Sequence, residues 1–104
     1  MAALIVFSTF PDAETALRIG RTLVEERCAA CVNLLPGVES VYWWRGGVET
    51  GTEVLAIFKT NEAGYPKLQS RLKELHPYEL PEIVAVQPWG GLPSYLQWVL
   101  RENA

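Results

Sequence analysis

The sequence is poor in the residues that build metal centres and disulfide scaffolds, with two cysteines and a single histidine among 104 residues. No apolar stretch approaches the roughly 20 residues that a membrane-spanning helix needs. Positive charge is not in excess either, because the net charge is −3 at pH 7. That balance excludes the electrostatic footprint of a nucleic-acid-binding protein and a basic patch for an anionic membrane. We therefore predict no nucleic-acid partner and no membrane partner.

Apolar residues, in contrast, are plentiful, at 49% of the chain. A chain of this size and composition can bury a core without disulfides or metals. The N-terminus has no basic region, and its apolar run ends at Ser8-Thr9, which indicates a buried strand and not a signal peptide. The sequence thus predicts a single domain over residues 1–104 and a cytoplasmic protein whose cysteines are thiols.

The first elements are a strand and an amphipathic helix. Residues 3–7 form a continuous apolar run typical of a central strand, and Pro11 with Asp12 ends it. Asp12 is the expected N-cap of the helix that follows. The buried stripe predicted from helical spacing consists of Ala13, Ala16, Leu17, Gly20, Leu23 and Val24.

A long hairpin comes next. Residues 31–35 and 38–44 read as one strand that Pro36-Gly37 interrupts, which indicates a bulge or a bend. Gly46-Gly47 is the expected turn, because both glycines accept positive φ. The return strand is predicted over residues 48–59, with a second bulge at Gly51.

The remaining elements are a helix, a stiff connector, a strand and a short helix. Thr60 or Asn61 is the expected cap of the second helix, and Pro66 fits its first turn. Residues 76–81 contain two prolines and predict a stiff connector. Residues 83–86 predict the last strand, and Pro93 opens a C-terminal helix. The buried stripe of the second helix is predicted to be Tyr65, Leu68, Leu72 and Leu75.

The resulting order, β-α-β-β-α-β plus one helix, predicts an α+β, ferredoxin-like sandwich with helices on one face of an antiparallel sheet. Tyr42, Trp43, Trp44 and Trp89 cannot all be buried beneath two helices. Exposed aromatic surface and unpaired strand edges both favour a closed homo-oligomer.

At this point the sequence resembles the CutA family, and the resemblance covers nearly the whole chain. It is carried by five segments: Cys31-Val32-Asn33-Leu34-Leu35-Pro36-Gly37, Tyr42-Trp43-Trp44 with Gly46, Glu53-Val54 leading to Lys59-Thr60, His76-Pro77-Tyr78-Glu79 with Pro81-Glu82-Ile83, and Tyr95-Leu96-Gln97-Trp98. The resemblance implies a compact homotrimer related in architecture to PII-type regulatory proteins. It also implies a role in tolerance of divalent cations, and copper binding is ascribed to some members. Two departures from the family pattern are Cys28 and the hairpin tip Arg45-Gly46-Gly47.

The candidate metal ligands are Cys31, His76, Glu79 and Glu82. A thiolate and an imidazole suit copper or zinc, and the two carboxylates, three residues apart, suit a hard cation or acid–base work. The alternatives are a buried apolar cysteine, a histidine that caps the preceding helix, and an intersubunit salt bridge. Two cysteines alone supply only half of the ligands of a tetrahedral metal site, so we predict no obligatory cofactor. Copper or another divalent cation is a candidate ligand.

A second candidate site is an interface pocket for a small ligand. A lysine on an apolar strand face needs a partner, and Lys59 shares a face with Glu53, so a structural pair or a pocket for an anionic ligand would explain both. Tyr42 and Trp44 could stack a ligand ring or anchor an interface, and the second reading is favoured. Such a pocket would make the chain a PII-like regulatory module. Its predicted residues are Asn33, Tyr42, Trp44, Glu53, Lys59 and Tyr78.

Enzymatic readings find no support in the sequence. An acylphosphatase would carry an arginine in the loop after the first strand, and residues 8–12 contain none. A copper chaperone of this topology would place Cys-x-x-Cys in that same loop, which has no cysteine. No nucleophile is paired with a base in a recognisable motif. We therefore predict a protein that is not an enzyme.

Overall fold

The computed structural model describes residues 2–103, and the predicted order of elements is confirmed. These are β1 (Ala3–Phe10), α1 (Ala13–Glu25), β2 (Cys31–Trp44), β3 (Gly47–Asn61), α2 (Tyr65–Leu75), β4 (Val84–Val86) and α3 (Pro93–Glu102). The four strands form one antiparallel sheet in the order β2-β3-β1-β4. No helix within residues 2–103 is long and apolar enough to cross a membrane.

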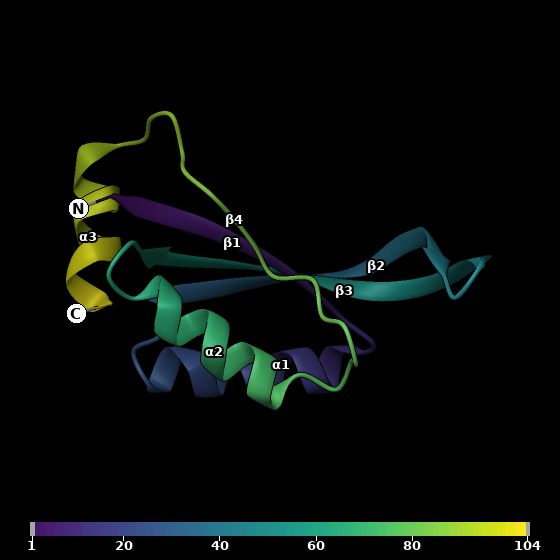
Figure 1. Cartoon of the computed structure of the whole chain (residues 1–104). Coiled ribbons are helices and arrows are strands. Elements are labelled where there is room, and N and C mark those ends of the chain that lie inside the picture. The colour runs from purple at the N-terminus through teal and green to yellow at the C-terminus, as the bar shows by residue number, and fades with distance from the viewer. Residues whose placement is uncertain (1, 104) are drawn as a thin grey trace.

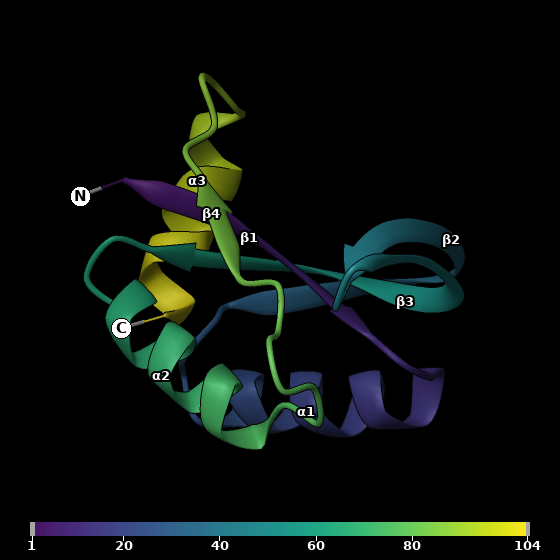
Figure 2. The ribbon, with the colours of Figure 1, turned by 45° about the vertical axis from the view of Figure 1, so that its right-hand side comes forward.

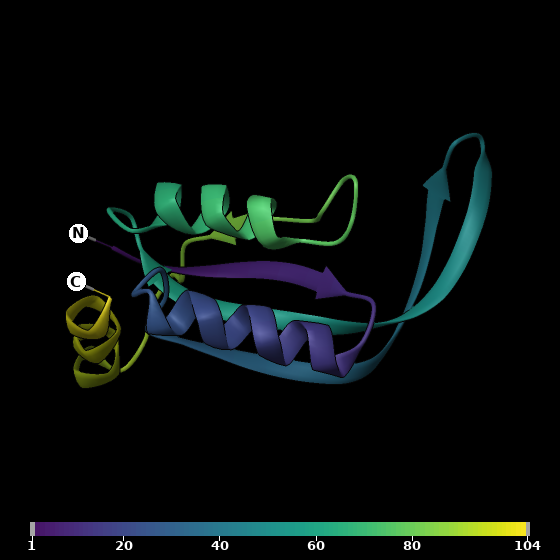
Figure 3. The ribbon, with the colours of Figure 1, turned by 90° about the horizontal axis from the view of Figure 1, so that it is seen from below.

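The sheet has one covered face and one open face. Helices α1 and α2 lie side by side beneath it, as Figures 1 and 3 show, and α3 lies at the end of the sheet opposite the hairpin tip. Because side chains alternate along a strand, every second residue of β1 and β3 points into the helical layer. The core of this layer is formed by Val6, Phe10, Ala16, Ile19, Leu23, Cys28, Ala29, Val54, Ala56, Phe58, Leu68 and Leu72.

The open face carries the alternate residues of the same strands. Phe7, Ile57 and Asn33 are neighbours across it, and so are Thr9, Leu55 and Leu35, through the registers of β1, β3 and β2. Leu35, Val84 and Val86 are exposed there. This face is therefore a mainly apolar surface that α1 and α2 do not cover (Figure 2).

Strand β1 is longer than predicted, because Ser8, Thr9 and Phe10 continue its ladder with β3 up to the pair Phe10–Val54. Ser8 is fully buried despite its hydroxyl. Hydrophobicity alone ended the predicted strand at the first polar residue. The ladder with β3 gives the backbone of residues 8–10 partners that a single strand cannot supply.

The N-cap of α1 is confirmed, because the Asp12 side chain accepts a 2.7 Å hydrogen bond from the Thr15 backbone. The predicted stripe is partly wrong. Leu17 is 61% exposed and Ala13 is also exposed, whereas Ile19 is buried and was missed. The buried stripe is Ala16, Ile19, Gly20 and Leu23, which keeps the same i, i+3, i+4, i+7 spacing as the predicted set but starts three residues later.

The long hairpin is confirmed, but its turn is not where the glycines suggested. Arg45 and Gly46 have the positive φ values, 50° and 84°, and Gly47 already belongs to β3. Two consecutive residues with positive φ are the signature of a type I′ hairpin turn. The predicted bulge at Pro36-Gly37 is confirmed as a register shift, while Gly51 pairs regularly with Ser40, so the second bulge was wrong.

The predicted cap of α2 was also wrong. Strand β3 continues through Thr60 and Asn61, and the N-cap is Gly64. The Asn61 side chain still accepts a hydrogen bond from the Gly64 backbone at 2.7 Å, and so stabilises the turn before the helix. Thr60 is fully buried and donates to the Cys28 carbonyl at 2.9 Å, which ties the end of β3 to the loop before β2.

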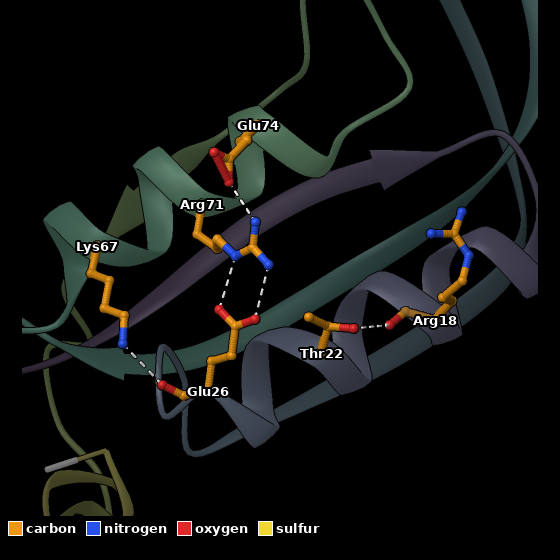
Figure 4. Close-up of polar contacts among 6 residues, drawn as sticks. All are labelled: Arg18, Thr22, Glu26, Lys67, Arg71 and Glu74. Atoms are coloured by element: carbon orange, nitrogen blue, oxygen red, sulfur yellow. Dashed lines mark hydrogen bonds and ion pairs between the residues drawn. The ribbon is translucent and has the colours of Figure 1, made fainter.

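An ion-pair network joins the two helices, as Figure 4 shows. Arg71 of α2 donates two hydrogen bonds of 2.9 Å to the two carboxylate oxygens of Glu26, and it also pairs with Glu74. Lys67 donates to the Glu26 carbonyl at 3.1 Å, so α2 also caps the end of α1. Bidentate geometry makes this the strongest of the surface pairs. The hydrogen bonds from Arg71 hold the pKa of the Glu26 carboxyl below its usual value.

This pair predicts a contribution to acid unfolding. Since the pKa of Glu26 is lower in the folded chain than in the unfolded chain, its contribution is present above the unfolded pKa, about 4.3, and is lost as pH falls through the folded value. We expect Glu26→Gln to flatten the fall in the free energy of unfolding below about pH 5. The measurement is urea unfolding from pH 7 to pH 3, with Glu25→Gln on the exposed side of α1 as the charge-matched control. An unchanged slope in Glu26→Gln would contradict the assignment.

Candidate functional site

A hollow in the described part of the chain lies between the hairpin and the connector that follows α2. It has a volume of about 990 Å³. One wall is residues 39–44 of β2 with Glu53 of β3, the other is residues 78–84, and Thr9 closes it at the end of β1. We call this hollow the hairpin groove. Residues far apart in sequence form it only because the connector turns back along the base of the hairpin.

The strand register places Tyr42, Trp44 and Glu53 on one face of the hairpin. Val38 pairs with Glu53, and after the bulge the alternate residues Tyr42 and Trp44 fall on the same side of the ribbon. The bulge matters here, because its extra residue shifts the pairing of β2 with β3 by one position from Val38 onward. Without it, Tyr42 and Trp44 would lie on the opposite face.

The connector is fixed to this face by Tyr78. Its hydroxyl donates a 2.7 Å hydrogen bond to a carboxylate oxygen of Glu53. Desolvation, and then this hydrogen bond to a carboxylate, raise the pKa of the Tyr78 hydroxyl well above its usual value. Tyr78 therefore remains a neutral donor throughout the physiological range.

A second link joins the hairpin tip to the connector. Arg45 pairs with Glu79 at 2.6 Å, and its guanidinium lies 5.2 Å from the centroid of the Trp44 ring. Both charged side chains are mostly exposed. The φ of 50° at Arg45 is part of the turn geometry, and the turn places this side chain beside the groove.

His76 lies beneath the connector and not in the groove. Its Nε2 is 2.9 Å from the Thr9 carbonyl, and its Nδ1 accepts a 3.1 Å hydrogen bond from the Tyr78 backbone N–H. Since Nδ1 accepts, Nε2–H is the donor to Thr9. The ring stacks on Phe10 at 4.5 Å, and burial lowers the pKa of His76, which favours the neutral ring. Both ring nitrogens are engaged within the chain, and together they anchor the start of the connector.

Three further predicted residues cluster elsewhere, on the open face. Lys59 donates to the Asn33 side chain, and Cys31 is the cross-strand neighbour of Lys59. The Cys31 sulfur lies 3.8 Å from the Tyr95 hydroxyl of α3. Lys59 is six residues from Glu53 along β3, which is about 20 Å at the rise of an extended strand. This cluster is therefore separate from the hairpin groove.

The predicted site residues thus lie in three places, which are the hairpin groove, the cluster around Lys59 on the open face, and the position of His76 beneath the connector. Tyr42, Trp44, Glu53, Tyr78, Glu79 and Glu82 line the groove. Within residues 2–103, no three His, Cys, Asp or Glu side chains are arranged to hold a metal ion. The predicted ligands Cys31 and His76 lie apart from the two glutamates, so their role as metal ligands stays a prediction. Sequence reasoning missed Glu39 and Trp43 as lining residues, although the length of the hairpin arms was a signal that this segment protrudes.

The fold and the groove define a class of small α+β proteins: a four-stranded antiparallel sheet, helices on one face, and a protruding hairpin that a connector meets at its base. The chain belongs to the family of the CutA1 divalent ion tolerance protein, whose pattern it matches over residues 4–102.

Individual relatives agree with this assignment. The chain is 50% identical to the divalent-cation tolerance protein CutA of Thermus thermophilus over 95% of each chain. It is 42% identical to the protein of the same name from Pyrococcus horikoshii, over 96% of this chain and 97% of the relative. The crystal structure of CutA from Xylella fastidiosa superposes with a TM-score of 0.96 at 46% identity and full coverage of both chains. The resemblance noted in the sequence is thereby confirmed.

Proposed function

We propose that the chain acts in tolerance of divalent cations and binds such cations, copper among them, weakly. The observation that carries the proposal is the family match across residues 4–102. The acidic lining of the hairpin groove supports it, since Glu39, Glu53, Glu79 and Glu82 place negative charge around one hollow and attract cations, although no three of them are arranged as a ready-made metal site within residues 2–103. Oxygen ligands of this kind suit hard divalent cations, and a wide, open arrangement gives weak binding. In this proposal the cation is cargo, and no cofactor is obligatory.

The working unit in this proposal is a homotrimer of ferredoxin-like, PII-like single domains over residues 1–104. The apolar open face supports assembly, because Leu35, Val84 and Val86 are exposed on it. The outer edges of β2 and β4 also have no neighbour within the sheet, and a second copy could satisfy their backbone groups.

We further propose that the protein is cytoplasmic, is not an enzyme, and uses neither nucleic acid nor a membrane as a partner. The names of the relatives describe tolerance and no reaction. Cys28 and Cys31 are both free thiols, which suits a reducing compartment. Burial raises the pKa of the Cys28 thiol, so this cysteine is an inert part of the core and not a redox group.

A second candidate function is a regulatory module that binds a small ligand in the hairpin groove, where the groove lies at a subunit boundary. The groove favours this reading, since its volume of about 990 Å³ is ample for an organic molecule.

The test is titration of the reduced protein with Cu(II) and Zn(II), with mass followed by light scattering. We expect saturable binding with a dissociation constant of about 10⁻⁴ M, as for open carboxylate sites. The double variant Glu79→Gln/Glu82→Gln should weaken cation binding. Glu62→Gln serves as the control, because Glu62 follows the end of β3 that lies away from the hairpin. Cys31→Ser and His76→Ala test the remaining two ligands. Binding that never saturates, or that none of these changes alters, would refute direct cation binding.

A further inference from the structure

The C-terminal helix α3 is held only weakly by apolar packing. It is 10 residues long, which is too short for a helix to be stable in isolation. Val99 alone among residues 93–102 is buried, and the N-cap residue Leu92 supplies no side-chain hydrogen bond. The helix therefore depends on polar contacts with the rest of the chain.

Those polar contacts gather around Arg27, just after the end of α1. Its guanidinium donates hydrogen bonds to the Glu102 carbonyl at 2.8 Å and to the Glu102 carboxylate at 3.1 Å. In return, the Asn103 side chain donates to the Arg27 carbonyl at 2.8 Å. The Asn103 amide oxygen also lies 2.5 Å from the buried Thr60 hydroxyl. We call the contacts of Arg27 with Glu102 and Asn103 the Arg27 latch.

Arg27 occupies a backbone position at which glycine is the usual residue. Its φ is 63°, in the left-handed region. Its N–H bonds to the Val24 carbonyl at 3.0 Å, and the Cys28 N–H bonds to the Leu23 carbonyl at 2.9 Å. This is the pattern of a Schellman motif, in which a residue with a side chain strains the left-handed position. Glycine would serve the end of α1 better, so the arginine is explained by what its side chain holds, which is α3.

Helix α3 can move without disturbing the sheet. Residues 87–92 connect it to β4 and contain neither helix nor strand. Figures 1 and 2 show α3 at the end of the sheet. Elements with few buried side chains at the margin of a fold are the ones that open locally at the lowest free energy.

We propose that α3 opens as a unit while the sheet, α1 and α2 stay folded, and that the Arg27 latch sets how often it does so. The position of α3 matters to the open face, because the Tyr95 hydroxyl lies 3.8 Å from the Cys31 sulfur. Opening withdraws Tyr95 from that thiol. The inference goes beyond both proposed functions and depends on neither of them.

The experiment is native-state hydrogen exchange of the full chain, followed by mass spectrometry for residues 93–102 and for β1 separately. We expect Arg27→Ala to speed exchange in α3 about fivefold, as for the loss of one hydrogen bond to a carbonyl and one exposed ion pair, with a smaller change in β1. Arg27→Gly should speed α3 exchange equally. In urea, however, its equilibrium constant for unfolding should be about fivefold lower than that of Arg27→Ala, because glycine relieves the left-handed backbone.

The matched control is Arg21→Ala, which removes an exposed arginine and its ion pair with Glu25 from the same helix and should leave α3 exchange unchanged. Unchanged α3 exchange in both Arg27 variants would refute the latch. Acceleration of α3 and β1 by the same factor would show that α3 does not open separately, and would overturn the proposal as well.

A substitution outside α3 tests the latch from its other side. Gly64 has helical φ and ψ values that alanine also adopts, so the backbone tolerates Gly64→Ala. The added Cβ would lie 3.0 Å from the Asn103 side-chain nitrogen and would push Asn103 aside. We expect faster exchange in α3, although Gly64 belongs to the start of α2. Unchanged α3 exchange in Gly64→Ala would contradict the role of Asn103 in the latch.

Discussion

Leu23→Ala is expected to lower the free energy of unfolding by about 2–5 kcal/mol, the range for removing a large aliphatic side chain from a tight core. Leu23 is fully buried at the centre of the α1 stripe. Its loss leaves a cavity between α1 and the sheet that neighbouring side chains fill only in part. The measurement is urea unfolding at a fixed protein concentration, because the stability of an oligomer depends on concentration.

Leu17→Ala is the matched control, since it makes the same change on the same helix. Leu17 is 61% exposed, so its truncation should alter the free energy of unfolding by less than about 0.5–1 kcal/mol. Equal losses in the two variants would mean that Leu17 is buried in the assembled protein and that the helix uses a wider face than a single chain shows.

Leu17 and Leu23 also show what the sequence pattern can predict and what it cannot. Spacing and caps were enough for the order of elements, the Asp12 cap and the bulge at Pro36-Gly37. Spacing could not choose between Leu17 and Ile19, because both lie within reach of the same helical stripe. Packing against the sheet decides the choice.

The errors at the strand ends have a related cause. Thr60 and Asn61 have side chains typical of helix caps, and this property alone predicts a cap there. In the structure they extend β3, whose ladder with β1 reaches Asn61 and satisfies their backbone groups. Likewise, Gly46 and Gly47 suggest a turn at those two residues. The register of the long β2–β3 ladder instead pairs Trp44 with Gly47, so the turn residues are Arg45 and Gly46, and Arg45 adopts a left-handed conformation.

The candidate site was predictable in part for the same reasons. Tyr42, Trp44 and Glu53 come from one hairpin, so alternation and the bulge determine that they share a face. The contact of Tyr78 with Glu53 joins residues 25 positions apart, and His76 anchors the connector just before Tyr78 through its own bonds to Thr9 and to the Tyr78 backbone. The path of a proline-rich connector is a tertiary property, so its return to the hairpin could not be read from local pattern.

Leu35→Glu is expected to dissociate the proposed trimer into monomers. Leu35 lies on the open face opposite Leu55 and is 44% exposed in the single chain, so a glutamate there can remain hydrated in a folded monomer. In a trimer that buries the open face, three such carboxylates would lose water without partners, a penalty of several kcal/mol for each ion. Light scattering should show the mass fall from about three times 11.6 kDa to 11.6 kDa at micromolar concentration, with unchanged circular dichroism.

Leu17→Glu separates this effect from the general effect of an added charge. It places the same side chain on α1, on the face of the sheet that the helices already cover, so the trimer should persist (Figure 3). The melting temperature supplies a second readout: it should rise with protein concentration in Leu17→Glu and become independent of concentration in Leu35→Glu. A Leu35→Glu protein that keeps the mass of the unsubstituted chain would show that the apolar open face is not the surface through which the copies associate. The exposed edges of β2 and β4 would then have to carry assembly by strand pairing alone.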